Sequence, residues 1–545
     1  MPDRELTTDL LREQARDRPG SKAVAVDGGR ALTFGELQDR SSRLGRALVA
    51  AGVSAQDRVA ILASNDDAPD AVGAHLAIHK AGAVAVPLNT RMSPAELAVA
   101  ARQSASRLVL VSASLRGSPQ ADALHEVVDL GVHEAPGAPR ECLGWTGPPG
   151  ATTLLGQATQ GGKPADPGAS SGEDLQVRIS PDDLADLLPT SGTTGNPKYV
   201  GATHRDALTL VRSPLPFPGT TYLHAVPLFT FTGAQALTLV PLASGMCQLV
   251  QSPFSPTRFL ELIEGAHAAF MVPAMAVLCA KDPRFESLRA PDLKVIMLGT
   301  AATPPSAISA WTERLPETII VNLYGLTEGG GAVCAIAGRE LAEHPSAAGR
   351  PVPPAELLIV RPDASPCDPG EIGEVLLRQP GVRRSYVGDA PASATTFDTD
   401  GWVHTGDLGY VDDTGLLYVV DRLKDMVIRG GFNVPSAEVE NVLLAHPDVL
   451  EAAVVGVPHE VLGEDLAAFI VLRGQTEVHG ERPGPGAELL DELRSHAGEH
   501  LADYKVPRRI WIVDELPRNP TGKVKKAELR AEARRLAELE WTPSA

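Results

Sequence analysis

Cysteine is scarce in this sequence, and the cysteines that occur are never paired. The 545 residues include five of them, and no two form a C-x-x-C pair. They are Cys142, Cys247, Cys279, Cys334 and Cys367. This spacing fits neither a zinc cluster nor a disulfide framework. We therefore expect a thiol-reducing, cytoplasmic setting.

Long hydrophobic runs are also missing. The N-terminus, MPDRELTTDLLREQ, carries acidic residues where a signal peptide needs an apolar run. The longest apolar stretches are interrupted by His267 and Pro273, or by Gln235 and Pro241. The sequence therefore predicts no segment that crosses or enters a membrane.

An excess of positive charge is absent too. Lysine and arginine number 49 against 68 acidic residues, so the formal net charge is −19. Such a balance repels the phosphates of nucleic acids and anionic lipid head groups. We expect neither nucleic acid nor a membrane as a partner. The exception is local, because ten basic residues lie between Lys505 and Arg535.

The sequence does have ample apolar material in an alternating pattern. Hydrophobic residues make up 43% and charged residues 21%, as in soluble globular proteins, and the length favours more than one domain. Helical patterns at 35–51 and 68–81 alternate with short apolar runs at 58–63 and 83–87. This alternation predicts an α/β fold in which mostly parallel sheets are flanked by helices.

Changes of pattern divide the rest of the chain. Between about 144 and 174, Gly, Pro, Ser and Thr replace the periodicity, which predicts a flexible surface connection. From about 345 to 422, short strands separated by Gly and Asp turns predict a β-rich subdomain. A small α+β unit with a basic C-terminal helix follows.

The strongest local signal is the segment PTSGTTGNPK at 189–198. Its glycines let backbone N–H groups approach an anion, its hydroxyls add neutral donors, and Lys198 supplies a point charge, a combination suited to a polyphosphate. It is not a Walker loop, because G-x-x-x-x-G-K followed by Ser or Thr does not occur. By itself the segment is equally compatible with a polar turn between two strands.

Together with four further segments, this loop resembles the signature motifs of the adenylate-forming superfamily of acyl-CoA synthetases, peptide-synthetase adenylation domains and luciferases. The four are NLYGLTE at 322–328, GWVHTGD at 401–407, DRLKD at 421–425 followed by Arg429-Gly430-Gly431, and LPRNPTGK at 516–523. Five motifs in the family's order are far more specific than any one alone. The chain is most similar to an acyl-CoA synthetase.

The resemblance implies a role for each motif when a carboxylate attacks the α-phosphate of ATP. Lys523 would bridge the two reacting anions, Thr327 would hydrogen-bond the α-phosphate, and Glu328 with Thr194 would hold Mg²⁺. The other implied ATP ligands are Thr190, Ser191, Gly192, Thr193, Gly195, Lys198, Asn322, Tyr324, Asp407 and Arg422. Taken singly, Tyr324 could be a core aromatic, Asp407 a turn residue and Lys523 a solvated charge.

In this family the C-terminal domain rotates between adenylation and acyl transfer. The resemblance therefore implies an AMP-binding domain at 1–422, a lid domain at 423–545 and a hinge at Lys424. Gly430 and Gly431 would let the pantetheine arm of coenzyme A approach, because they have no side chain. The alternative for Lys424 is an exposed charge in a turn.

Two positions depart from the family's pattern. Tyr199 stands where glycine usually follows the loop lysine; its bulk is harmless if it points outward but otherwise alters how the loop closes. Thr230 stands where the family commonly carries histidine or another aromatic residue beside the acyl site and the acceptor channel. Either this is a silent change, or it leaves open an unusual acid or an acceptor other than coenzyme A.

The acyl pocket implied by the motifs is mostly neutral. Its members are His224, Phe229, Thr230, Thr300, Ala301 and Gly329. Because it holds no lysine or arginine, a second substrate carboxylate would lack a partner, which argues against dicarboxylic acids. His224 is equally compatible with a satisfied residue at a strand end. The glycines at 329–331 either leave room for substrate or add flexibility.

We therefore expect an ATP- and Mg²⁺-dependent ligase that converts a small carboxylic acid to an acyl-adenylate, releases pyrophosphate and passes the acyl group to coenzyme A. The main alternatives are transfer to an amine, to another nucleophile or to a separate carrier protein, since no carrier serine motif follows Lys523. A non-catalytic nucleotide- or acyl-binding homologue and a luciferase-type oxygenase are further alternatives. The expected state is a monomer or homodimer.

Overall fold

The computed structural model describes most of the chain. It covers residues 4–115, 118–121, 124, 143–144, 175, 177–190, 198–473, 487–518 and 523–540. The predicted flexible connection, apart from Gly144, lies outside the described residues. No helix in these ranges is long and apolar enough to cross a membrane.

The chain divides into two compact units. Residues 1–345, 349–356 and 377–403 make up the first unit, and residues 346–348, 357–376 and 404–545 make up the second. The predicted hinge at Lys424 falls inside the second unit. The domain boundary at 422/423 and the hinge remain predictions.

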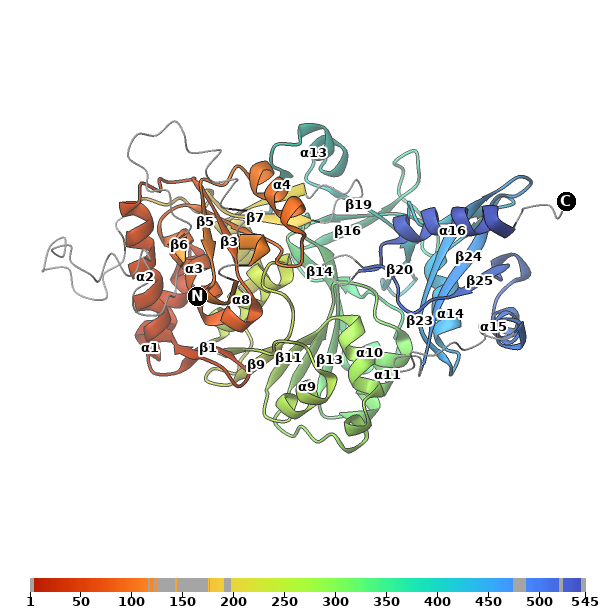
Figure 1. Ribbon diagram of the computed structural model, residues 1–545, viewed down its shortest axis with the longest axis horizontal. Helices are drawn as coiled ribbons and strands as arrows, with labels where there is room; N and C mark the ends of the chain where they lie inside the picture. The colour runs from red at the N-terminus through yellow and green to blue at the C-terminus, as the bar shows by residue number, and fades with distance from the viewer. Residues whose placement is uncertain are drawn as a thin grey trace, which may run out of the picture. The chain divides into compact units, whose positions relative to one another are not determined.

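The first unit contains a nine-stranded sheet with a parallel centre (Figure 1). From edge to edge its strands are β15 (Arg350–Pro351), β14 (Gly331–Ala337), β13 (Ile319–Leu326), β12 (Val295–Leu298), β11 (Ala268–Met271), β9 (Thr221–His224), β10 (Cys247–Val250), β1 (Lys22–Val26) and β2 (Ala31–Thr33). The strands from β13 to β1 pair in parallel, and β14, β15 and β2 join antiparallel at the edges. The central strands are short and largely buried, as in a sheet covered on both faces.

A second, seven-stranded sheet carries the predicted phosphate loop. Its order is β18 (Ser385–Tyr386), β8 (Lys198–Thr203), β7 (Leu184–Thr190), β4 (Val84–Pro87), β3 (Arg58–Leu62), β5 (Leu108–Val111) and β6 (Leu143–Gly144). Strands β7 to β6 are parallel, whereas β8 and β18 are antiparallel to their neighbours. The loop therefore joins two adjacent antiparallel strands.

Helices of the first unit flank these sheets. They are α1 (Thr7–Asp17), α2 (Phe34–Ala50), α3 (Ala68–Lys80), α4 (Pro94–Ser104), α7 (His204–Leu208), α8 (Leu237–Ser244), α9 (Pro256–Ile263), α10 (Pro273–Lys281), α11 (Pro305–Arg314), α12 (Gly338–Glu343) and α13 (Ala390–Thr396). Capping boxes from Thr33 to Glu36 and from Ser93 to Glu96 start α2 and α4. Helix α3 differs because every residue in it is buried, including His75, His79 and Lys80.

The second unit is built on two smaller sheets. One has the order β16 (Glu356–Val360), β17 (Gly373–Arg378), β19 (Val403–Val411) and β20 (Leu417–Arg422). The other consists of β22 (Phe432–Val434), β21 (Val427–Arg429), β24 (Gly463–Leu472) and β23 (Val449–His459), with β25 (Arg509–Ile512) parallel to β24. Alternate residues of β23 face two cores: Val454 packs with α14 (Ser436–Leu444) and α15 (Ala487–His500), and Val455 packs with α16 (Lys526–Glu540).

These observations confirm the predicted fold class. The first unit is α/β with largely parallel sheets, and the C-terminal part of the chain is a small α+β unit. Strands β16, β17, β19 and β20 make up the β-rich region, and most of it belongs to the second compact unit; the subdomain bounds of 345–422 remain a prediction.

Candidate functional site

The two ends of the predicted phosphate loop meet as paired strand residues. Thr190 ends β7, Lys198 begins β8, and the two lie opposite each other in the register. The hydroxyl Oγ1 of Thr190 donates to the main-chain oxygen of Lys198 at 3.5 Å. The predicted phosphate ligands Ser191, Gly192, Thr193, Thr194 and Gly195 lie outside the described residues, so their roles remain predictions.

Glu328 is held by a residue that the sequence analysis missed. The hydroxyl of Tyr386 donates to Oε1 of Glu328 at 2.8 Å, and Nζ of Lys198 lies 4.8 Å from the centroid of the same ring. Burial and the neighbouring Glu328 carboxylate raise the pKa of Tyr386, so the phenol stays protonated. Strand β18, which carries Tyr386, pairs with β8, the strand that begins at Lys198. Tyr386 therefore connects the end of the predicted phosphate loop with Glu328 of the second signature motif.

Thr327 has a second missed partner in Arg384. Nη1 of Arg384 donates to the main-chain oxygen of Thr327 at 2.6 Å. Arg384 is only 5% exposed, and burial lowers its pKa to about 10 although Asp206, Asp186 and Glu328 act to raise it. The guanidinium is still charged at neutral pH.

The neighbouring motif residues lie on β13. Asn322 and Tyr324 are half-buried, and Oδ1 of Asn322 accepts from Oγ1 of Thr303 at 3.4 Å. After Glu328 the chain turns back into β14 through Gly330 and Gly331, with φ of +87° and +114°. These values favour glycine, so the glycines serve the turn.

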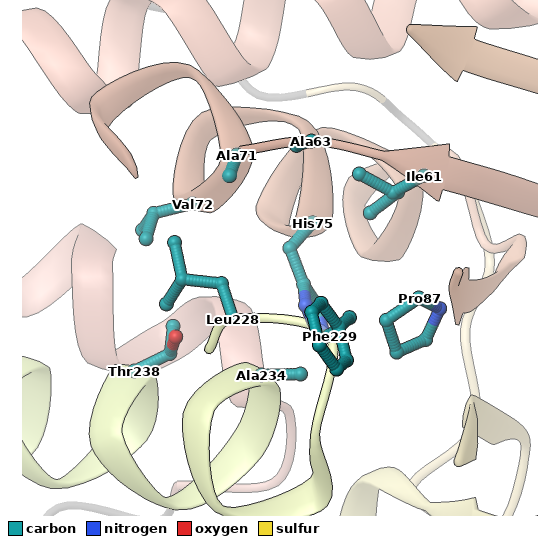
Figure 2. A pocket seen from close by; sticks show the side chains of 10 residues that line it. All are labelled: Ile61, Ala63, Ala71, Val72, His75, Pro87, Leu228, Phe229, Ala234 and Thr238. Carbon is teal, nitrogen blue, oxygen red and sulfur yellow. The ribbon is translucent and has the colours of Figure 1, made fainter. Parts of the chain in front are cut away.

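The predicted acyl-pocket residues have varied surroundings. Phe229 lines an apolar pocket together with His75, Leu228 and Pro87, whose side chains are labelled in Figure 2. The pocket has a volume of about 20 Å³, enough for about one water molecule. An acyl group therefore does not fit into it.

Thr230 uses its hydroxyl locally. Oγ1 donates to the main-chain oxygen of Pro227 at 2.9 Å and accepts from the N–H of Gly233 at 3.0 Å. A Cβ at Gly233 would lie 2.1 Å from the Pro227 oxygen. Thr230 thus closes a tight turn before the π-helix Thr232–Ala236.

His224 is buried with both ring nitrogens engaged. Nδ1 accepts from the N–H of Val226 at 3.2 Å, and Nε2 lies 2.9 Å from Nε2 of Gln248. Burial lowers the pKa of His224 to about 3, so the ring is neutral. Thr300 has a φ of +79° after β12, Ala301 is exposed and Gly329 is buried. Their roles in an acyl pocket remain predictions.

Tyr199 points into the protein. Its hydroxyl donates to the main-chain oxygen of Ala100 at 2.8 Å, and its ring belongs to the core with Leu97, Ala101 and Val86. Burial raises its pKa. The side chain is therefore accommodated between β8 and α4.

In the second unit, Asp407 and Arg422 form an ion pair. They face each other across β19 and β20, with Nε of Arg422 2.9 Å from Oδ1 of Asp407. The aspartate is buried and the N–H of Asp407 donates to Oγ1 of Thr405 at 3.0 Å. The arginine side chain is about half exposed, which leaves it accessible to a ligand.

Three of the remaining predicted residues of the second unit, Lys424, Gly430 and Gly431, lie in turns. The main-chain oxygen of Lys424 accepts from Nη2 of Arg530 at 3.0 Å. Gly430 and Gly431, with φ of +60° and +87°, form the two-residue turn between β21 and β22, a type that needs positive φ at both positions. Lys523 is exposed.

Comparison with known proteins gives a consistent assignment. Residues 11–387 match the family described as AMP-binding enzyme, and residues 438–523 match the AMP-binding enzyme C-terminal domain. A propanoyl:CoA ligase of Mycobacterium tuberculosis, whose acyl group carries a methyl-dioxo-octahydro-indenyl ring system, is 35% identical over 532 residues, which are 94% of this chain and 96% of that protein.

Solved structures agree with this match. The ATP-bound structure of MatB from Rhodopseudomonas palustris has a TM-score of 0.81 and 28% identity, covering 97% of this chain and 99% of that chain. The amide bond synthetase McbA from Marinactinospora thermotolerans has a TM-score of 0.80 and 28% identity, covering 97% and 100%.

Proposed function

Because the chain belongs to the AMP-binding enzyme family, we propose that it is an AMP-forming acyl-CoA ligase. In the first step a carboxylate oxygen attacks the α-phosphorus of ATP, the bond to the β-phosphate oxygen breaks, and pyrophosphate leaves. In the second step the thiol sulfur of coenzyme A attacks the acyl carbonyl, AMP leaves, and the thiol proton passes to solvent. The products are the acyl thioester, AMP and pyrophosphate.

The support given to Thr327 and Glu328 carries the assignment of the nucleotide site. Arg384 fixes the Thr327 carbonyl and Tyr386 orients the Glu328 carboxylate. The hydrogen-bond partner of Glu328 is a neutral phenol, and carboxylate oxygens are ligands that a hard divalent cation prefers. We propose that Glu328, with Thr194, holds Mg²⁺ and that Thr327 hydrogen-bonds the α-phosphate.

Groups of the second unit complete the proposed assignment. Asp407 accepts from the ribose hydroxyls, Arg422 binds ribose or phosphate, and Lys523 bridges the substrate carboxylate and the α-phosphate. Lys424 acts as the hinge, and the turn at Gly430-Gly431 lies along the path of the acceptor. Placing a lysine between two anions lowers the barrier of the adenylation step alone.

The test is a screen of carboxylic acids that measures pyrophosphate release and product mass. We expect release with at least one acid and a thioester product in the presence of coenzyme A. ATP binding without release for any acid would favour a non-catalytic nucleotide-binding protein. Light emission or O₂ uptake would indicate a luciferase-type oxygenase.

Lys523→Ala separates the two half-reactions. We expect about a 10²- to 10³-fold loss of adenylation and unchanged thioester formation from supplied acyl-adenylate, because only adenylation brings two anions together. Lys525→Ala, two residues away and also exposed, is the matched control. Equal losses in both half-reactions would contradict the assigned role.

An amine acceptor is the second candidate. It is favoured by the likeness to the amide bond synthetase McbA and by Thr230, whose hydroxyl is used to close its own turn. Adding primary amines in place of coenzyme A and recording product mass distinguishes an amide from a thioester.

Location and assembly are further proposals. We propose a cytoplasmic protein, in keeping with the free thiols of Cys247, Cys279, Cys334 and Cys367. We also propose a monomer or homodimer. Cell fractionation and the molar mass in solution test these two proposals.

A further inference from the structure

A buried polar cluster lies in the first unit outside the predicted motifs. Oδ1 of Asp186, in β7, accepts from Nε2 of His75 at 2.6 Å and from Nε2 of His79 at 3.2 Å. The two histidines are four residues apart on α3 and therefore share one face of the helix. The three side chains, here named the Asp186 cluster, are exposed by 5% or less.

The distances in the Asp186 cluster are those of hydrogen bonds. Its donor atoms lie within 4.8 Å of one another, and two histidines with a carboxylate are also a familiar metal-ligand set. Two ligands of a tetrahedral zinc ion would be about 3.3 Å apart for bonds of about 2.0 Å. The 2.6 Å between His75 and Asp186 is too short for such a pair and fits a charge-assisted hydrogen bond.

Asp186 holds a buried negative charge. Burial alone would raise its pKa, but His75 and His79 lower the pKa well below its usual range. A buried carboxylate is stable only while its hydrogen bonds are kept. Both oxygens are engaged, since Oδ2 accepts from Nε2 of Gln235 at 2.6 Å.

Gln235 connects this carboxylate to Arg384. Its Oε1 accepts from Nη2 of Arg384 at 3.1 Å. Because the amide nitrogen is engaged by Asp186, the amide cannot flip without losing both bonds. Arg384 in turn donates Nη1 to the Thr327 oxygen and lies over the ring of Phe231, 5.5 Å from its centroid.

We propose that Asp186 is a positioning residue for the nucleotide site. Through Gln235 it sets the orientation of the Arg384 guanidinium, which holds the carbonyl of Thr327 and thereby fixes Thr327 and Glu328. A planar guanidinium is suited to this role, because its two Nη groups donate in fixed directions. The inference rests on the proposed function, in which Thr327 and Glu328 face MgATP.

The test compares the affinity of the full-length protein for ATP with and without Mg²⁺, by calorimetric titration. We expect Asp186→Asn and Arg384→Gln each to reduce the Mg²⁺-dependent gain in ATP affinity about 10- to 100-fold. The double variant should lose no more of this Mg²⁺-dependent affinity than the single variant with the larger loss, because both residues act through one connection. If these residues only stabilised the fold, their substitution would not selectively lower the Mg²⁺-dependent part of the ATP affinity.

Matched controls are available beside each residue. Asp182→Asn and Arg383→Gln make the same chemical changes at exposed neighbours, and both should behave as wild type. Gln235→Met keeps the side-chain length and removes both hydrogen bonds, so it should reproduce the loss. If Asp186→Asn does not fold by circular dichroism, Gln235→Met takes its place in the cycle with Arg384→Gln.

Distinct results overturn different parts. The positioning role is overturned if the losses of Asp186→Asn and Arg384→Gln add up in the double variant, or if Gln235→Met binds MgATP as tightly as wild type. Either result leaves the proposed function intact. A wild-type protein that does not bind MgATP overturns both. A stoichiometric transition metal in the purified protein that is lost in Asp186→Asn overturns the hydrogen-bond assignment of the Asp186 cluster.

Discussion

Glu328 in the first unit and Asp407 in the second are carboxylates held by opposite kinds of partner. Glu328 accepts from the neutral hydroxyl of Tyr386, whereas Asp407 pairs with the guanidinium of Arg422. A phenol orients a carboxylate without cancelling its charge, and a guanidinium largely cancels it. The first arrangement suits an acid that attracts a metal ion, and the second suits an acid that accepts from neutral hydroxyls.

The largest expected effect is that of Glu328→Gln. The substitution removes the carboxylate charge, so we expect about a 10²- to 10³-fold loss of pyrophosphate release, with the Mg²⁺ requirement moved to higher concentration. The measurement is the rate of release as a function of Mg²⁺. An unchanged Mg²⁺ dependence would show that the contrast between the two acids is wrong.

Asp407→Asn should act more weakly and differently. We expect about a tenfold rise in the KM for ATP, with the Mg²⁺ dependence unchanged, because this acid is assigned to the ribose. ATP analogues lacking a ribose hydroxyl sharpen the test. They should bind more weakly than ATP to wild type but equally well to the variant.

Tyr386→Phe should have a smaller effect again. It removes one hydrogen bond to Glu328 and keeps the ring under Lys198, so we expect about a fivefold slower adenylation. Tyr410→Phe, in the stacked pair with Tyr418 of the second unit, is the matched control. A loss as large as that of Glu328→Gln would mean that Tyr386 contacts the nucleotide directly.

His204→Gln is expected to have the smallest effect on activity at neutral pH. His204 is buried in the unit that holds Glu328, and its substitution should instead change how the free energy of unfolding depends on pH. Burial lowers the pKa of His204 to about 3 from 6.5. Its folded pKa lies below its unfolded pKa, so stability is full above pH 6.5 and falls as pH drops toward 3, by up to about 1.4 kcal/mol per pH unit. The variant should show a shallower fall in the free energy of unfolding, measured by urea titration, with His500→Gln as the exposed control.

Local sequence patterns predicted much of this molecule. The alternation of helical and apolar segments gave the parallel sheets, because buried parallel strands are apolar along their whole length. The signature motifs identify Asp407, Arg422, Gly430 and Gly431, although they predict neither the ion pair nor the two-residue turn that these residues form. In each case the information is local or belongs to a short motif.

Contacts between distant segments could not be read in this way. Tyr386 and Arg384 reach Glu328 and Thr327 across more than fifty residues, from a two-residue strand and the position just before it, which have no periodicity to detect. The sequence leaves open whether Tyr199 points outward or alters the loop, and the structure shows a core residue whose hydroxyl is bonded to a residue of α4. The sequence leaves open whether Thr230 is a silent change or alters the acyl site, and it does not reveal that the Thr230 hydroxyl closes a turn.

Strand β18 also sets a rule for exchanging segments among related enzymes. Arg384 directly precedes β18 and Tyr386 ends it, and the two side chains hold Thr327 and Glu328. A deletion or insertion between 379 and 383 that shifts the pairing of β18 with β8 by one residue would turn Tyr386 to the other face and displace Arg384 with it. A graft that alters acyl specificity must therefore preserve the length of this segment, even where its composition is free to vary.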